Sequence, residues 1–131
     1  MPEPQDSVPT LASFRPALRA LVWGASGGIG GAFVAALEAN PRVAAVMAAS
    51  RKAAAPWCFD LEDEGSIEAV AQAAAASGPL DLVLVATGVL LPNPEKRWRQ
   101  LDPGVLSRAY AINAIGPALI AKHTLGLLRR D

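Results

Sequence analysis

The sequence has few of the residues that build disulfides and metal sites. It contains one cysteine, Cys58, and one histidine, His123. A lone cysteine cannot form an internal disulfide, and one histidine with one cysteine falls short of the usual ligand count of a metal site. Cys58 is therefore expected in the core and His123 in a structural or exposed position. The composition predicts neither a disulfide scaffold nor a metal enzyme, and it fits a reducing compartment.

Net charge and long apolar runs are also lacking. Twelve basic residues balance twelve acidic ones, so the chain has no basic footprint for nucleic acid or for an anionic membrane. The basic cluster at 96–99 is short and is interpreted as a solvated loop. No uninterrupted apolar run reaches the roughly 18 residues of a membrane-spanning helix. The chain is expected to bind neither nucleic acid nor membrane.

Hydrophobic residues, in contrast, make up 52% of the 131 residues, enough for one domain with a buried core. The first 16 residues differ from the rest, because they contain four prolines. They also lack the basic and apolar regions of a signal peptide. We expect a flexible leader over residues 1–16, one domain over residues 17–131, and a cytoplasmic protein.

Strands and helices alternate along this domain. Apolar strands are expected over 17–23, 43–50, 57–61 and 82–86. Helices are expected over 28–39, 64–76 and 102–128, with Asp63 capping the second and Asp102-Pro103 opening the third. The connection 51–56 is too short for a crossover helix, so a loop is expected there. The buried stripe of the first helix is predicted to consist of Ile29, Phe33, Ala36 and Leu37.

This alternation predicts an α/β fold, a three-layer doubly wound parallel sheet of the Rossmann type. Right-handed crossovers place the first strand in the middle and give the order 3-2-1-4 for about four strands. The crevice between the first and fourth strands then lies above the turn that follows the first strand.

That turn is rich in glycine and reads Gly24-Ala25-Ser26-Gly27-Gly28-Ile29-Gly30. Glycines let backbone N–H groups and the positive end of a helix approach an anion, for which the pyrophosphate of a dinucleotide is the natural choice. Ser26 offers an additional hydroxyl. No Lys-Ser/Thr follows the glycines, which excludes a Walker phosphate loop. The alternative is a tight turn whose glycines serve packing alone.

Together with three further landmarks, this turn resembles the short-chain dehydrogenase/reductase family. The turn is similar to the family's TGxxxGxG. Asp60-Leu61 stands where members of the family have the residues that contact adenine. Ala86-Thr87-Gly88 stands where the family has the motif NAG, and Asn113 where it has its catalytic asparagine. The resemblance covers about Leu18 to Leu128. It implies hydride transfer between a nicotinamide cofactor and a carbonyl or alcohol substrate.

The end of the second strand bears on the choice of cofactor. An acidic residue there would accept from the 2′-hydroxyl of NAD, whereas this chain has Ser50-Arg51. A guanidinium pairs with a 2′-phosphate, so NADP is favoured over NAD, with Lys52 in a position to assist. The alternative is a solvated loop arginine.

The resemblance implies roles for the other landmarks as well. Asp60 would accept from the adenine amino group while the backbone of Leu61 frames the ring; the alternative is a strand-end aspartate that caps a turn. Gly88 would let the backbone approach the ribose. Val85 and Ala86 replace asparagines of the family here, so the bracing role of those asparagines is not expected.

Asn113 is the one catalytic residue that the resemblance implies, through a backbone carbonyl that holds a water for a catalytic lysine. Pro117 lies four residues later and lacks the N–H that would bond this carbonyl. A helix kink and a free carbonyl at Asn113 are therefore predicted. The alternative is a kink that only fits the helix to the sheet.

The family's catalytic Tyr-x-x-x-Lys is absent, since Tyr110 is the only tyrosine and Ala114 stands four residues after it. The sequence is therefore expected to be the cofactor-binding half of an NADP-dependent short-chain oxidoreductase, inactive by itself. The alternatives are a non-catalytic dinucleotide-binding or signalling module and a non-functional remnant. An open edge on the last strand and an apolar last helix predict a homo-oligomer.

Overall fold

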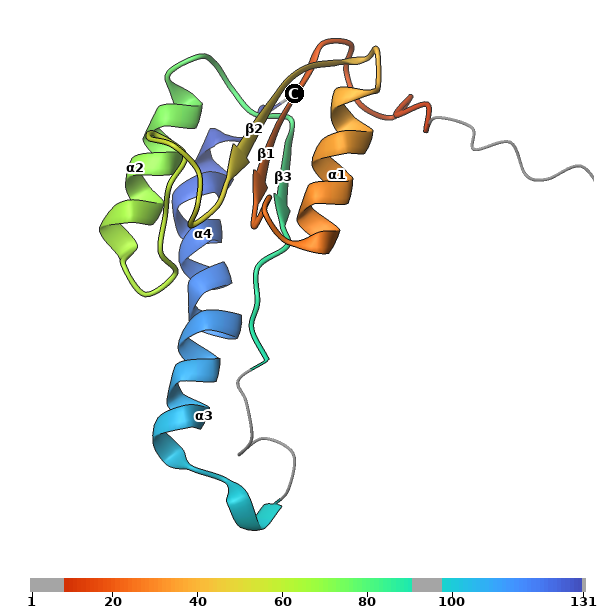
Figure 1. The fold of residues 1–131 in the computed structure, drawn as a ribbon. Helices are drawn as coiled ribbons and strands as arrows, with labels where there is room; N and C mark the ends of the chain where they lie inside the picture. Colours follow the sequence, from red (N-terminus) through yellow and green to blue (C-terminus); the bar gives the residue numbers. More distant parts are fainter. Residues whose placement is uncertain (1–8, 91–97, 131) are drawn as a thin grey trace, which may run out of the picture.

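The computed structural model describes residues 9–90 and 98–130. A three-stranded parallel sheet forms its centre, with helices on both faces (Figure 1). The strands are β1 (Leu18–Trp23), β2 (Val43–Ala49) and β3 (Leu82–Val85), in the order β2-β1-β3. The central strand β1 is almost wholly buried, as its continuous apolar sequence predicts for a strand inside a parallel sheet.

The core lies on both faces of the sheet because side chains of β1 alternate between them. On one face, Leu21 and Trp23 join a cluster with residues of α2 (Glu64–Ala75) and α4 (Gly116–Thr124). On the other face, Leu18, Ala20 and Val22 pack with Leu37 of α1 (Gly28–Glu38). Figure 1 shows α1 alone on its face of the sheet and α2 with α4 on the opposite face.

The predicted strand at 57–61 is wrong. The other three predicted strands, at 43–50, 17–23 and 82–86, do lie next to one another in the predicted order, as β2-β1-β3. Ser50 and Cys58 form a single isolated bridge beyond the end of β2. Its two hydrogen bonds run from Ser50 N to the Trp57 carbonyl, 3.1 Å, and from Phe59 N to the Ser50 carbonyl, 3.4 Å. Pairing stops there because β2 ends at Ala49 and the Asp60 side chain turns the chain away by accepting from Glu62 N, at 2.8 Å.

The prediction that Cys58 lies in the core is also wrong. Its thiol is exposed and lies 3.3 Å from the carbonyl oxygen of Arg51. The next residue, Phe59, is buried and meets Trp23 edge to face, with ring centroids 4.9 Å apart. Side chains of this segment alternate between exposed and buried, as expected of an extended chain, but the buried side chain is Phe59 and not Cys58.

The predicted buried stripe of α1 is wrong except at Leu37. Ile29 is 72% exposed and Phe33 is 43% exposed. The helix instead turns Gly30, Val34 and Leu37 toward the sheet. A Cβ on Gly30 would lie 2.0 Å from the Gly24 carbonyl oxygen, so the glycine permits a contact that fixes the rotation of the helix. Ile29 and Phe33 each precede a residue of this face and lie roughly 100° around the helix from it.

The last helix is one continuous segment with a π-helical turn inside it. It comprises α3 (Pro103–Tyr110), the π-helical η2 (Ala111–Ile115), α4 and the 3-10 turn η3 (Leu125–Leu127). The predicted cap is confirmed, because the Asp102 side chain accepts from Val105 N at 3.0 Å. Figure 1 shows α3 extending past the carboxyl ends of the strands, and α3 has no buried residue.

By length and composition alone, the helix Pro103–Leu127 is long and apolar enough to cross a membrane. It has 25 residues and a mean hydropathy of 1.2. The segment is not an uninterrupted apolar run, because polar residues are scattered through it. In this structure α4 packs against α2 and the sheet, and Ile120 belongs to the core.

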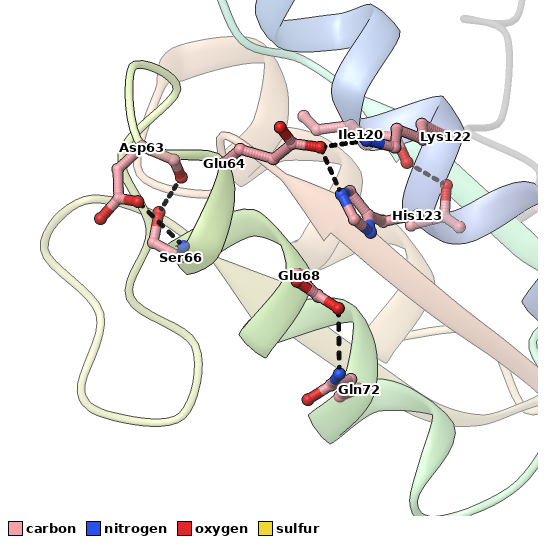
Figure 2. Close-up of polar contacts among 9 residues, drawn as sticks. Asp63, Glu64, Ser66, Glu68, Gln72, Ile120, Lys122 and His123 are labelled. Carbon is pink, nitrogen blue, oxygen red and sulfur yellow. Dashed lines mark hydrogen bonds and ion pairs between the residues drawn. The ribbon is translucent and has the colours of Figure 1, made fainter.

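Polar contacts join the first turn of α2 to the last turn of α4 (Figure 2). The Glu64 carboxylate accepts from Lys122 Nζ at 2.5 Å and lies 3.0 Å from His123 Nε2. The hydrogen bond from Lys122 and then that from His123 lower the pKa of Glu64, and the same pairing raises the pKa of Lys122. The predicted cap of α2 is confirmed, since Asp63 accepts from Ser66 N at 3.4 Å.

The described part of the predicted leader, residues 9–16, is attached to the domain. Leu11 and Phe14 pack against the α1-side core. Arg42 Nη2 donates to the Phe14 carbonyl and Asn40 Nδ2 to the Pro9 carbonyl, both at 2.6 Å. Residues 1–8 of the leader, and Lys96 and Arg97 of the basic cluster, lie outside the described residues.

The chain returns to the amino end of β3 after its last helix. Leu80 N donates to the Leu127 carbonyl at 3.0 Å, and Arg129 N donates to the Leu80 carbonyl at 2.7 Å. Asp81, at the same end, accepts from Arg19 N and from Arg129 Nε, each at 2.9 Å. Burial pushes the pKa of Asp81 upward, but these two hydrogen bonds and the positive charges of Arg129 and Arg15 together outweigh it and lower the pKa.

Candidate cofactor site

A cleft of about 220 Å³ opens at the carboxyl ends of the strands. Five segments form its walls: the glycine turn, the end of β2, the turn at 59–62, the segment after β3, and the helix α3–η2. Ten residues predicted to bind a cofactor line it, namely Gly24, Ser26, Gly27, Ser50, Arg51, Asp60, Leu61, Ala86, Thr87 and Gly88. Gly28, Ile29, Gly30 and Asn113 are predicted residues that do not line it.

Two glycines of the turn are required by packing. Gly24 has a φ of +84°, and a Cβ on it would lie 2.5 Å from the Ala86 carbonyl oxygen. The contact between Gly30 and the Gly24 carbonyl brings α1 against the turn. At these two positions the packing interpretation accounts for the glycine fully.

Packing does not account for Gly27 and Gly28. A Cβ on Gly28 would meet nothing within 4 Å, and one on Gly27 would make an ordinary contact of 3.5 Å with the Gly24 carbonyl. These residues begin α1, where Gly27 is the N-cap and no side chain caps the helix. Gly27 lines the cleft, so the N–H groups that begin α1 lie at the cleft wall, where an anion is stabilised. The residues present therefore fit a pyrophosphate group.

The end of β2 places a cation on the cleft wall. Ser50 is buried, and its hydroxyl accepts from Lys52 N at 3.3 Å, which turns the chain outward. Arg51 is exposed and lines the cleft. Its guanidinium is therefore accessible to an anionic ligand, as the cofactor prediction requires.

The side chain of Asp60 caps the turn at 59–62 in this structure. One carboxylate oxygen of Asp60 accepts from Glu62 N, and Asp60 N donates to Ser66 Oγ at 2.9 Å. Leu61 packs closely on the last helix, where a Cβ on Gly116 would lie 2.8 Å from Leu61 Cδ2. Gly116 thus lets the helix approach the turn.

Asn113 acts through its side chain in this structure. Val89 N donates to Asn113 Oδ1 at 2.7 Å, and Asn113 Nδ2 donates to the Val89 carbonyl at 2.8 Å. This pair ties the segment after β3 to the long helix. The predicted interruption of the helix takes the form of the π-helical turn, with Gly116 N donating to the Ala111 carbonyl just before Pro117. The carbonyl role of Asn113 remains a prediction.

Five residues that the sequence did not single out also line the cleft: Phe59, Glu62, Val89, Arg108 and Ile112. Arg108 Nε lies 3.7 Å from Glu62 Oε2. This ion pair joins α3 to the turn at 59–62 across 45 intervening positions, so no local pattern marks it. The spacing of Arg108, Ile112 and Gly116 was the available signal, because residues four apart share a helix face.

No protein-family model and no curated protein matches the sequence. Solved structures do match. The NADPH-bound carbonyl reductase from chicken fatty liver is 24% identical with a TM-score of 0.71, over 86% of this chain and 52% of that one. A variant of a Serratia marcescens short-chain dehydrogenase/reductase is 23% identical with a TM-score of 0.73, over 87% and 53%. The chain has the fold of the N-terminal half of the short-chain dehydrogenases/reductases.

An aldohexose dehydrogenase from Thermoplasma acidophilum, in its ligand-free form, extends this likeness at lower identity. It is 18% identical with a TM-score of 0.67, over 89% of this chain and 47% of that one. The chain thus spans about half the length of the proteins it matches. The predicted resemblance in fold to the cofactor-binding half of this family is confirmed.

Proposed function

We propose that this chain is a member of the short-chain dehydrogenase/reductase family and that its cleft binds NADP. The single observation that carries the proposal is that α1 begins on the cleft wall, at the N-cap Gly27, with no side chain capping the helix. The exposed Arg51 on the same cleft favours NADP over NAD. The carbonyl reductase of the same fold from chicken is NADPH-bound, which supports the choice.

Each wall of the cleft has a part in this binding. The backbone N–H groups at the start of α1 hold the pyrophosphate, with the Ser26 hydroxyl beside them, and Arg51 holds the 2′-phosphate. Asp60 and Leu61 border the base, and Thr87-Gly88 border the ribose. When bound, the nicotinamide supplies hydride chemistry toward a carbonyl or alcohol. The chain's own residues bind and orient the cofactor.

Catalysis by these 131 residues is a separate matter, because they contain no Tyr-x-x-x-Lys. This observation favours a second candidate, a dinucleotide-binding module that performs no turnover by itself. We expect no oxidation of NADPH with carbonyl substrates by the chain alone. Sustained turnover that increases in proportion to the chain's concentration would contradict this expectation.

Self-association and a cytoplasmic location complete the proposal. Exposed apolar side chains on the long helix support a homo-oligomer, and so does the outer edge of β3, which has no partner among residues 9–90 and 98–130. The residues concerned are Tyr110, Ile115 and Leu125. Light scattering at micromolar concentration tests this point, and a uniform monomer would contradict it.

The cofactor claim is tested by titrating NADPH and NADH into the chain and following tryptophan fluorescence and heat. Trp23 is a suitable reporter, since it precedes Gly24 and contacts Phe59 of the cleft. NADPH is expected to bind about tenfold more tightly than NADH, and Arg51→Ala to remove this difference. Arg99→Ala is the matched control and is expected to preserve it, because Arg99 stacks on Trp98 and does not line the cleft. Absence of calorimetric binding of either nucleotide would overturn the proposal.

A further inference from the structure

The long helix faces the turn at 59–62 with three residues at intervals of four. Gly116 admits Leu61, Ile112 is buried beside the cleft, and Arg108 pairs with Glu62. Arg108 is the outermost of the three, because α3 extends beyond the sheet (Figure 1). Along this helix face, Gly116 packs closely against the turn, Ile112 forms an apolar part of the cleft wall, and Arg108 adds a positive charge at its outer end.

Neither packing nor stability explains the placement of Arg108. Its side chain is 61% exposed and that of Glu62 is 43% exposed, and α3 buries no residue. Exposed ion pairs contribute little to stability. Glu62 is nevertheless well positioned, since its backbone N–H is held by Asp60. The pair therefore holds the guanidinium beside the turn at 59–62, on the cleft wall.

The groups on this part of the cleft wall suit a purine. Leu61 and Ile112 offer apolar surfaces, and Asp60 offers a carboxylate to an exocyclic amino group. A guanidinium is planar and stacks on aromatic faces, which a lysine ammonium does not do in the same way. We propose that Arg108, held by Glu62, stacks on the base of the bound dinucleotide and closes the outer end of its subsite. This inference rests on the proposed function.

The test compares 5′-AMP, 2′,5′-ADP and NADPH as ligands of the full chain by calorimetry. Arg108→Ala is expected to weaken all three by a similar factor, about five- to tenfold. Arg108→Lys should recover only part of this loss, and Glu62→Gln should cost less than Arg108→Ala. Arg99→Ala is the matched control, because Arg99 stacks on Trp98 and does not line the cleft.

The outcomes separate this inference from the proposal beneath it. If the wild type binds none of the ligands, both are overturned. If the wild type binds NADPH but Arg108→Ala leaves the affinity for 5′-AMP unchanged, only the role of Arg108 is overturned. A loss confined to 2′,5′-ADP and NADPH would also overturn it, because Arg108 would then be a phosphate ligand. Superimposable circular dichroism spectra establish that each variant is folded.

Discussion

The two walls of the cleft are built in different ways. The glycine-turn wall is set by backbone packing, with Gly24 against the Ala86 carbonyl and Gly30 against the Gly24 carbonyl. The wall formed by the segment after β3 and the long helix is set by side-chain contacts. Asn113 holds Val89 there, and Arg108 pairs with Glu62. The first wall is fixed by close backbone contacts, and the second is held by a few polar side-chain contacts near the surface.

This difference implies different functions for the two walls. A wall fixed by backbone packing holds its shape without a ligand, which suits a group of constant geometry such as a pyrophosphate. A wall held by exposed polar contacts opens at low cost. The long-helix wall is therefore expected to admit and release the ligand. Substitutions in the two walls should separate stability from binding.

The largest effect is expected in the glycine turn. Gly30→Ala forces a Cβ to within 2.0 Å of the Gly24 carbonyl oxygen, so the turn and α1 must separate. We expect a loss of about 3 kcal/mol in the free energy of unfolding, measured by urea denaturation. Unchanged stability would show that this wall is not fixed by packing.

Gly28→Ala is the matched variant in the same turn. Its Cβ meets nothing within 4 Å, so the free energy of unfolding is expected to stay within about 0.5 kcal/mol of the wild type. NADPH affinity should fall about tenfold or more, because the methyl group occupies the space before the helix N-terminus. Undiminished affinity would argue that the ligand does not approach this turn.

Asp81 provides a test at the end of the sheet far from the cleft. Asp81→Asn weakens the charge-assisted bonds to Arg19 N and Arg129 Nε, and about 2 kcal/mol of stability should be lost at pH 7. NADPH affinity should not change beyond this loss of folded protein. A specific fall in affinity would show that the two ends of the sheet are coupled.

The pH dependence of stability follows from the same residue. The pKa of Asp81 is lowered from its ordinary value of 3.8 in the folded state. Its contribution is therefore complete above about pH 4 and is lost as the pH falls through the folded-state pKa. Below pH 4, Asp81→Asn should lose less stability than the wild type in urea denaturation. Parallel curves for the two proteins would contradict this.

Outside the glycine turn, the smallest effect on stability is expected at Asn113. Asn113→Ala removes both hydrogen bonds to Val89 in an exposed setting, at a cost of about 1 kcal/mol. The segment after β3 should then exchange its amide hydrogens faster, while the amides of β1 keep their protection. Hydrogen exchange measures this, and equal protection at Val89 in both proteins would refute the side-chain role.

Local sequence patterns predicted much of the fold. The apolar strands around Val22, Val46 and Leu84 are confirmed, as are the caps at Asp63 and Asp102. These features depend on neighbours in the sequence. The segment 57–61 has the composition of a strand, but pairing also requires a partner strand that continues alongside it, and β2 ends at Ala49.

Contacts between distant residues account for what the sequence did not predict. The stripe of α1 depends on the approach of Gly30 to Gly24, which outweighs the hydrophobicity of Ile29 and Phe33. The pair of Arg108 with Glu62 joins a helix to a turn far away in the sequence. In the glycine turn, spacing marked the site, but only the space around each residue separates Gly24 and Gly30 from Gly27 and Gly28.

The central claim is that a dinucleotide lies with its pyrophosphate before the N-terminus of α1. The most direct measurement is a titration of the 15N-labelled chain with NADPH, followed by backbone amide chemical shifts. The amides of Gly27, Gly28 and Ile29 are expected to shift most, with Arg51 responding to NADPH more than to NADH. Saturable binding that leaves the amides of the glycine turn unmoved would contradict the claim.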